Sequence, residues 1–321
     1  MRLPWGYKRA FLCCALLFLL GTVLQWLTGG IPPHLLHYPL SAVLALLYTY
    51  ALVVLQLLSG RFPRLRRLYD TYSATASTVS VVAMAILFGL VPQGEGGTGP
   101  AVALGWTQMR SNWAFNLLMF YLMTGIGLSA IAGLRQLRSA RPASVLSHVA
   151  TYLVLCAAFF GNGDKVEALV TTVRGEVVAV GEDKGGKPVE LPFMLRLESF
   201  DIEEYPLAPG PADTVRTEDG QPMAMPRRFP KRYLSDVTIL SRTGEERVTI
   251  AVNHPARVGP WRIYQYGYDM SQGARSHTSE LLCVKDGWYP LIGAGLWMLL
   301  GAGVLMFLTA GVRRKKKEVR Q

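Results

Sequence analysis

The sequence predicts a polytopic α-helical membrane protein of about six transmembrane helices, with one large, mainly antiparallel, β-sandwich-like domain outside the membrane. Two observations predict this class. Half of the 321 residues are hydrophobic, only 17% are charged and the mean hydropathy is +0.25, which is too apolar for an ordinary soluble protein. The charge is also unevenly distributed, since residues 163–289 carry 16 Lys and Arg against 19 Asp and Glu, whereas the rest carries 17 against 3.

Six apolar runs are long enough to cross a hydrocarbon layer of about 30 Å. They are residues 10–28, 39–58, 74–92, 113–134, 144–161 and 290–312. The first run is expected to be a retained span rather than a cleaved signal peptide, because no convincing small-residue cleavage site follows it.

The clusters of positive charge lie beside these runs and predict the topology. Lys and Arg near span ends favour the cytoplasmic side. The clusters are Arg2/Lys8/Arg9, Arg61/Arg64/Arg66/Arg67, Arg135/Arg138/Arg141 and Arg313/Arg314/Lys315/Lys316/Lys317. Six crossings place all of them inside, with both termini inside and residues 162–289 outside. The net charge of +11 therefore indicates a membrane surface, and nucleic acid is not an expected partner.

The outside segment has the period of two that is typical of half-buried strands. Phe193, Leu195 and Leu197 alternate with Met194, Arg196 and Glu198, and the segments SDVTIL and ERVTIAVN follow the same pattern. The intervening residues 241–244, SRTG, predict a hairpin turn. The chain therefore divides into a two-span N-terminal extension (1–70), a three-span core block (71–162), the β domain (163–289) and a closing span with a basic tail (290–321).

The stretch VNHPARVGPWRIYQYGYD predicts a strand end, a Pro-flanked turn at His254 and a returning strand. Regular alternation places Tyr264, Tyr266 and Tyr268 on one face of that strand, where cross-strand packing is the plainer role. These three tyrosines and His254 are structural or partner-facing candidates.

Few residues outside the β domain suggest chemistry. The spacing of side chains supports no hydrolytic motif, so no catalytic residue is assigned, and the four cysteines have neither CxxC nor zinc-site spacing, so no metal site is assigned. His148 differs because it lies about one turn inside the fifth apolar run. An ionisable side chain within a span suggests function, and imidazole is a common haem ligand. The alternative is a neutral histidine that is bonded to a neighbouring helix or directed toward the interface.

Several segments, in order, resemble the ResB family, the membrane component of system II cytochrome c biogenesis. The span ending in GLVPQ, the segment SNWAFNLLMFYLMTGIGLSAIAGLRQLR and the histidine-led SHVATYLVLCAAFFGNGD are similar to the family's three core spans. LPFMLRLESFDIEEYP, RFPKRYLSDVTIL and VNHPARVGPWRIYQYGYD resemble its outer-domain strands, and DGWYPLIGAGLWMLLGAG its closing span. The resemblance covers roughly residues 70–312, and the first two spans have no counterpart in it.

The resemblance implies a function in cytochrome c maturation in the bacterial inner membrane, with the large domain in the periplasm. It implies haem b as a transient cofactor, His148 as a candidate haem ligand, and two partners: a CcsA-type haem-handling membrane protein and apocytochrome c with its CXXCH motifs. The chain would be a subunit of a cytochrome c synthase rather than an enzyme alone. A different class, a non-catalytic envelope scaffold whose β domain binds a partner protein, stays open, and a transporter is less favoured because no repeat is visible.

Overall fold

The computed structural model describes residues 5–32, 37–94, 98–136, 141–205, 213–216, 222–225, 230–269 and 277–318. The chain divides into two compact units, one formed by residues 1–164 with 288–321 and the other by residues 165–287.

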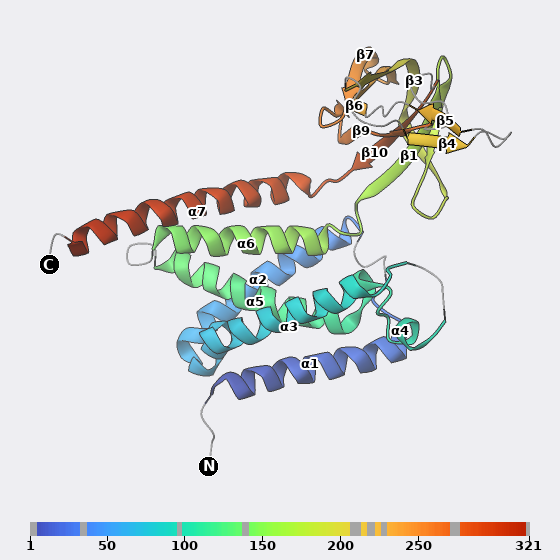
Figure 1. Ribbon diagram of the computed structural model, residues 1–321. Coiled ribbons are helices and arrows are strands. Elements are labelled where there is room, and N and C mark those ends of the chain that lie inside the picture. Colours follow the sequence, from blue (N-terminus) through green and yellow to red (C-terminus); the bar gives the residue numbers. More distant parts are fainter. Residues whose placement is uncertain are drawn as a thin grey trace. The chain divides into compact units, whose positions relative to one another are not determined.

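The first unit is a helical bundle (Figure 1). Its elements are α1 (Tyr7–Thr28), α2 (Leu40–Arg61), the 3-10 helix η2 (Pro63–Tyr69), α3 (Thr71–Leu90), α4 (Pro100–Ala103), the 3-10 helix η3 (Met109–Ser111), α5 (Trp113–Arg135), α6 (Pro142–Phe160) and α7 (Tyr289–Glu318). Six helical segments of the described chain are long and apolar enough to span a membrane, which confirms the six predicted spans. Helices are the expected form, because backbone groups in hydrocarbon must find their partners within the segment.

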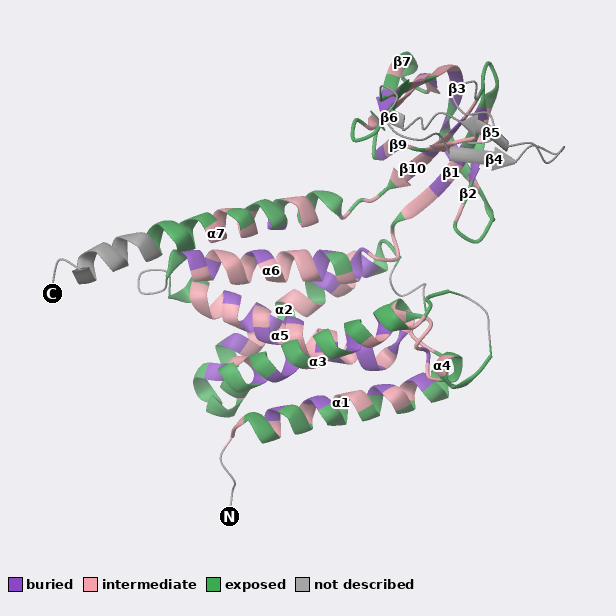
Figure 2. Cartoon of the chain, in the orientation of Figure 1, coloured by how far each residue is buried: buried purple, intermediate pink, exposed green. Residues whose placement is uncertain are grey.

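Helix α5 occupies the middle of the bundle, where it packs against α1, α2, α3 and α6, while α7 packs against α6. Figure 2 shows exposed residues along α1, α3 and α7 and buried residues where helices meet. The exposed side chains on α1 are large and apolar, such as Leu16 and Leu19, as expected for a surface that faces lipid. The helices begin at recognisable signals: Asp70 and Asn112 accept hydrogen bonds from backbone N–H groups in the first turns of α3 and α5.

The first two spans are built into the bundle. Gly21 of α1 lies against the backbone of Ala114 in α5, and a Cβ at Gly21 would lie 2.3 Å from the Ala114 Cα. Gln25, only 3% exposed, accepts a hydrogen bond from Trp113 N at 3.1 Å and donates one to Gly29 O at 2.9 Å. Helices in lipid usually associate where a small residue lets two backbones approach closely and where a buried polar side chain has hydrogen-bond partners.

The second unit is an antiparallel β domain. Its strands are β1 (Val166–Val173), β2 (Val177–Glu182), β3 (Pro188–Glu204), β4 (Asp213–Arg216), β5 (Pro222–Met225), β6 (Pro230–Ser241), β7 (Gly244–Ala251), β8 (Ala256–Val258), β9 (Trp261–Tyr268) and β10 (Thr278–Lys285). Eight of them form one sheet in the order β7-β6-β3-β2-β1-β10-β9-β8, and β4 pairs with β5. The predicted hairpin is present, since Ser241 pairs with Gly244 between β6 and β7.

The sheet curls around a single apolar core, and β7 lies beside β8 and β9 at the other end of the strand order. Alternate residues of β1, β3, β6, β9 and β10 point into this core, including Val170, Leu195, Val237, Ile263 and Leu281. Bulges between β2 and β3, β3 and β6, and β9 and β10 bend the strands. The predicted fold class is confirmed. The β domain, which was expected to be sandwich-like, consists of one nearly closed sheet.

We expect Gly21→Ala to destabilise the bundle by about 1–3 kcal/mol, because the added methyl group forces α1 away from the α5 backbone. Denaturant titration of the detergent-solubilised protein measures the effect. Gly89→Ala in α3 is the matched control, since a Cβ there meets nothing within 4 Å. Equal stability of the two variants would show that α1 does not pack against α5 as described.

Candidate functional site

The intramembrane histidine predicted from the sequence lies near the start of α6. Pro142 occupies the first helical position after Arg141, where a missing N–H costs nothing, and the N–H groups of Ser144 and Val145 donate to the Arg141 carbonyl. His148 follows one turn later and is half-buried.

Within the part of the chain that the structure describes, one nitrogen of the His148 ring has a hydrogen-bond partner. Nδ1 lies 2.7 Å from the carbonyl oxygen of Ser144, four residues earlier in the same helix. A carbonyl can only accept, so Nδ1 carries the hydrogen and donates it. In the neutral ring, Nε2 then has an unshared electron pair. A backbone carbonyl that holds Nδ1–H is a common way of orienting an imidazole whose Nε2 binds a metal.

His148 lines a hollow between α5 and α6. The hollow has a volume of about 260 Å³ and is open to its surroundings. It is lined by Ser129, Gly133, Arg141, Ser144, Val145 and His148. Gly133 brings the two helices close, because a Cβ at this position would lie 2.9 Å from the Val145 side chain. The hollow therefore combines one free imidazole nitrogen, two serines and a guanidinium group.

These residues fit haem in their chemistry and only partly in volume. A neutral imidazole can ligate iron without bringing a charge into the membrane, and Arg141 can pair with a carboxylate such as a haem propionate. Pockets that enclose a ligand of drug size are usually about 300–1,000 Å³, so this open hollow suits one edge of a macrocycle. Within the described residues, no group of three or more His, Cys, Asp or Glu could hold a metal ion.

The other predicted histidine, His254, lies in a tight turn of the β domain. Its N–H donates to Ala251 O at 2.9 Å and its carbonyl accepts from Ala251 N, so Val252 and Asn253 form the turn. Asn253 has a φ of 67°, a left-handed conformation that Asn tolerates better than most residues. The His254 side chain is exposed, and its backbone closes the turn.

The prediction that Tyr264, Tyr266 and Tyr268 share one face is wrong for Tyr268. A β-bulge at Tyr266 shifts the register, so that Leu281 pairs with Gln265 but Glu280 pairs with Gly267. Tyr268 then pairs with Ser279, which is fully buried, and its ring stacks on Phe200 at 5.4 Å. A strand pattern assumes unbroken alternation, which one extra residue reverses. Tyr266 remains 64% exposed on the surface.

Cys283 is a core residue of the β domain. Its side chain is fully buried, its thiol is free, and burial raises its pKa to about 12. A thiol in this environment stays protonated and behaves as a small apolar group. Cys283 therefore packs in the core of the β domain as a small apolar side chain.

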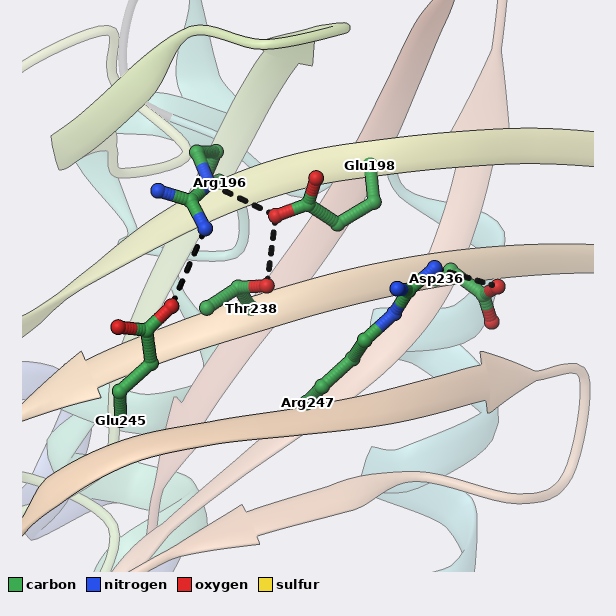
Figure 3. A network of polar contacts seen from close by, with 6 residues as sticks. All are labelled: Arg196, Glu198, Asp236, Thr238, Glu245 and Arg247. Carbon is green, nitrogen blue, oxygen red and sulfur yellow. Dashed lines mark hydrogen bonds and ion pairs between the residues drawn. The ribbon is translucent and has the colours of Figure 1, made fainter.

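A charged network covers three neighbouring strands of the β domain (Figure 3). Glu198 accepts hydrogen bonds from Thr238 at 2.6 Å and Arg196 at 2.7 Å, and these donors hold the pKa of the carboxyl group below its usual range. Arg196 also contacts Glu245 at 3.1 Å, and Arg247 lies 3.5 Å from Asp236. The charges are paired with one another across β3, β6 and β7, which is typical of a solvated sheet surface.

Asp164 is a polar junction that sequence reasoning missed. It follows the end of α6, is 12% exposed, and accepts hydrogen bonds from Tyr38 N at 2.5 Å, Ser41 Oγ at 2.9 Å and Trp288 Nε1 at 2.8 Å. His37 Nδ1 lies 4.0 Å from the same carboxylate. One carboxylate thus joins the end of α6 to the start of α2 and to the residue before α7. The only sequence signal was an Asp directly after an apolar span.

These features define the class of the protein: a polytopic helical membrane protein that carries a large antiparallel β domain and an imidazole with a free nitrogen among its spans. The sequence model of the ResB-like family matches residues 137–287, from just before α6 to the end of the β domain. This match confirms the ResB resemblance for that part of the chain and points to cytochrome c biogenesis. Among curated proteins, none matches the sequence.

Replacing Asp164 by Ala should lower the free energy of unfolding by roughly 1.5–3 kcal/mol, because three donors lose a charged acceptor. Denaturant titration in detergent measures the loss. Asp201→Ala, at an exposed position of β3, is the control and should leave stability within about 0.5 kcal/mol of wild type. If both variants match wild type, Asp164 does not tie these helices together.

Proposed function

We propose that the chain holds haem b at His148 and acts with a CcsA-type partner in delivering haem to apocytochrome c. The observation that carries this proposal is the hydrogen bond between His148 Nδ1 and Ser144 O, which leaves Nε2 without a partner among the described residues, in a side chain that lines an open hollow. An unpaired ring nitrogen within a membrane span is costly unless a ligand uses it. The ResB-like match supplies the biological context.

The proposed topology follows the distribution of positive charge. Lys and Arg clusters beside the spans favour a cytoplasmic location for both termini and for the start of α6. His148 would then lie in the cytoplasmic half of the bacterial inner membrane, and the β domain in the periplasm. Haem that enters from the cytoplasmic side would meet the His148 hollow first.

The openness of the hollow favours a shared site. About 260 Å³ cannot enclose a porphyrin, so a second surface must cover the remainder. We assign that surface to the CcsA-type partner, which would supply the remaining contacts to the haem. Arg141, at the rim of the hollow, can pair with a propionate and fix the direction in which the ring enters.

Covalent attachment makes little catalytic demand on this chain. The apocytochrome cysteine sulfur bonds to one carbon of a haem vinyl group and a proton goes to the other, so nothing leaves. Such an addition depends chiefly on position and on thiols that stay reduced. In this proposal the chain's contribution is to bind and orient the haem.

His148→Ala should reduce haem occupancy by at least about tenfold in protein purified with its CcsA-type partner, because an iron ligand is lost. The Soret absorbance per mole of protein measures occupancy, and haem staining of c-type cytochromes measures function. His254→Ala removes an exposed imidazole from the β-domain turn and should change neither.

Equal Soret absorbance in wild type and His148→Ala would contradict the ligand assignment. Normal holocytochrome c in cells that lack the gene would contradict the whole functional proposal. That second outcome would favour the alternative class, an envelope scaffold whose β domain binds a partner protein.

A further inference from the structure

Helix α2, which has no counterpart in the core family pattern, reaches both helices that line the His148 hollow. Two adjacent residues of α2 make these contacts. Thr49 Oγ1 lies 2.8 Å from Tyr152 OH of α6, and Tyr48 OH lies 2.9 Å from Thr124 Oγ1 of α5. Both pairs lie within segments that are long and apolar enough to span the membrane.

The direction of the first hydrogen bond can be assigned. Thr49 Oγ1 also lies 2.8 Å from Ala45 O, and a carbonyl can only accept. The single Thr49 hydroxyl hydrogen therefore goes to Ala45, and Tyr152 donates its hydrogen to Thr49 Oγ1. The hydroxyl groups of Thr49 and Tyr152 therefore both have hydrogen-bond partners. In this pair, α2 accepts the hydrogen bond that α6 donates.

The second pair follows the same logic. Thr124 Oγ1 donates to Phe120 O at 2.7 Å, so Tyr48 donates to α5, with Thr124 Oγ1 as the nearer acceptor at 2.9 Å and Phe120 O as the farther one at 3.3 Å. Tyr48 also packs its ring against Phe120 and Phe160. Helix α2 therefore accepts a hydrogen bond from α6 and donates one to α5, at successive residues.

The three helices meet at Gly127 of α5. A Cβ at Gly127 would lie 2.5 Å from Leu52 Cδ1 of α2 and 2.9 Å from Tyr152 Cε2 of α6. Because this position has no side chain, the Tyr152 ring can lie against α5 while its hydroxyl reaches α2. Any rotation of α6 about its axis would separate Tyr152 from Thr49.

Tyr152 and His148 are four residues apart on α6, so they lie on the same face, one turn from each other. A constraint on the rotation of α6 at Tyr152 is therefore a constraint on the direction of the His148 ring. The backbone bond to Ser144 fixes the ring within its own helix, but it cannot fix the helix relative to α5.

We propose that Thr49 and Tyr152 are positioning residues of the His148 site, through which the second span sets the direction of the haem ligand. This inference rests on the proposed haem function. It gives α2 a role in the site, although α2 contributes no residue to the lining of the hollow.

The test compares full-length Tyr152→Phe, Thr49→Val and Thr49→Ser in the complex with the CcsA-type partner. Phe and Val each remove the interhelical hydrogen bond, and we expect haem affinity to fall about three- to tenfold, as for other hydrogen bonds between membrane helices. Thr49→Ser keeps the acceptor oxygen and should restore wild-type affinity and the wild-type Soret maximum. The controls are Thr151→Val, whose hydroxyl bonds to Ser147 O of its own helix, and Tyr50→Phe, at a 68% exposed position on α2.

A second readout needs no haem. Diethyl pyrocarbonate modifies accessible imidazoles, and mass spectrometry compares its rate at His148 with the rate at exposed His254. We expect Tyr152→Phe and Thr49→Val to change the modification rate of His148 by at least about twofold relative to wild type and to both controls. Both variants lack the hydrogen bond between α2 and α6, whose strength corresponds to about a three- to tenfold change in an equilibrium constant.

The two readouts separate the possible failures. In the first case, wild type and His148→Ala differ in haem content, but Tyr152→Phe and Thr49→Val change neither the haem affinity nor the modification rate of His148. The positioning inference is then overturned and the proposed function stands. If the modification rate changes but wild type holds no haem, the positioning contact is supported and the proposed haem function fails. A Thr49→Ser variant that behaves like Thr49→Val would also overturn the inference, because the oxygen would then be irrelevant.

Discussion

The interior of a bilayer offers no water, so every polar group on a transmembrane helix must find its partner in the protein. Around α5 and α6, several side chains meet that constraint with partners in the protein. Hydroxyl groups of α2 bond to both helices, and His148 bonds to the carbonyl of the preceding turn. Nε2 of His148 differs from these groups because it remains available. The hydrogen bond from Nδ1 to Ser144 O is therefore the interaction that decides which ring nitrogen can bind a ligand.

Polar residues at the ends of the spans hold the rest of the bundle in register. Gln25 joins the end of α1 to the start of α5, and Asp164 joins the end of α6 to α2 and to Trp288. Between these ends the helices approach at residues without bulky side chains, such as Gly21 and Gly127. The first two spans, which fall outside the core family pattern, thus pack directly against α5.

Much of the fold could be predicted because its signals are local. Spans of about 20 apolar residues and the alternation around Leu195 and Val237 are visible in short windows of sequence, as is the turn at residues 241–244. His148 could be singled out because an imidazole within a span is rare. The contacts that position it could not be predicted, since Thr49 and Tyr152 are 103 residues apart. The bulge at Tyr266 and the junction at Asp164 were missed for the same reason: each depends on a partner distant in sequence.

The position of the hydrogen on the His148 ring decides whether Nε2 can bind iron. Solid-state nitrogen-15 NMR of histidine-labelled full-length protein in lipid bilayers, without haem, distinguishes protonated from unprotonated ring nitrogens, and His148→Gln assigns the signals. We predict a neutral ring with hydrogen on Nδ1 and an unprotonated Nε2, because Nδ1 donates to Ser144 O. A neutral ring with its hydrogen on Nε2 would contradict the account, since the nitrogen proposed to bind iron would then carry a proton.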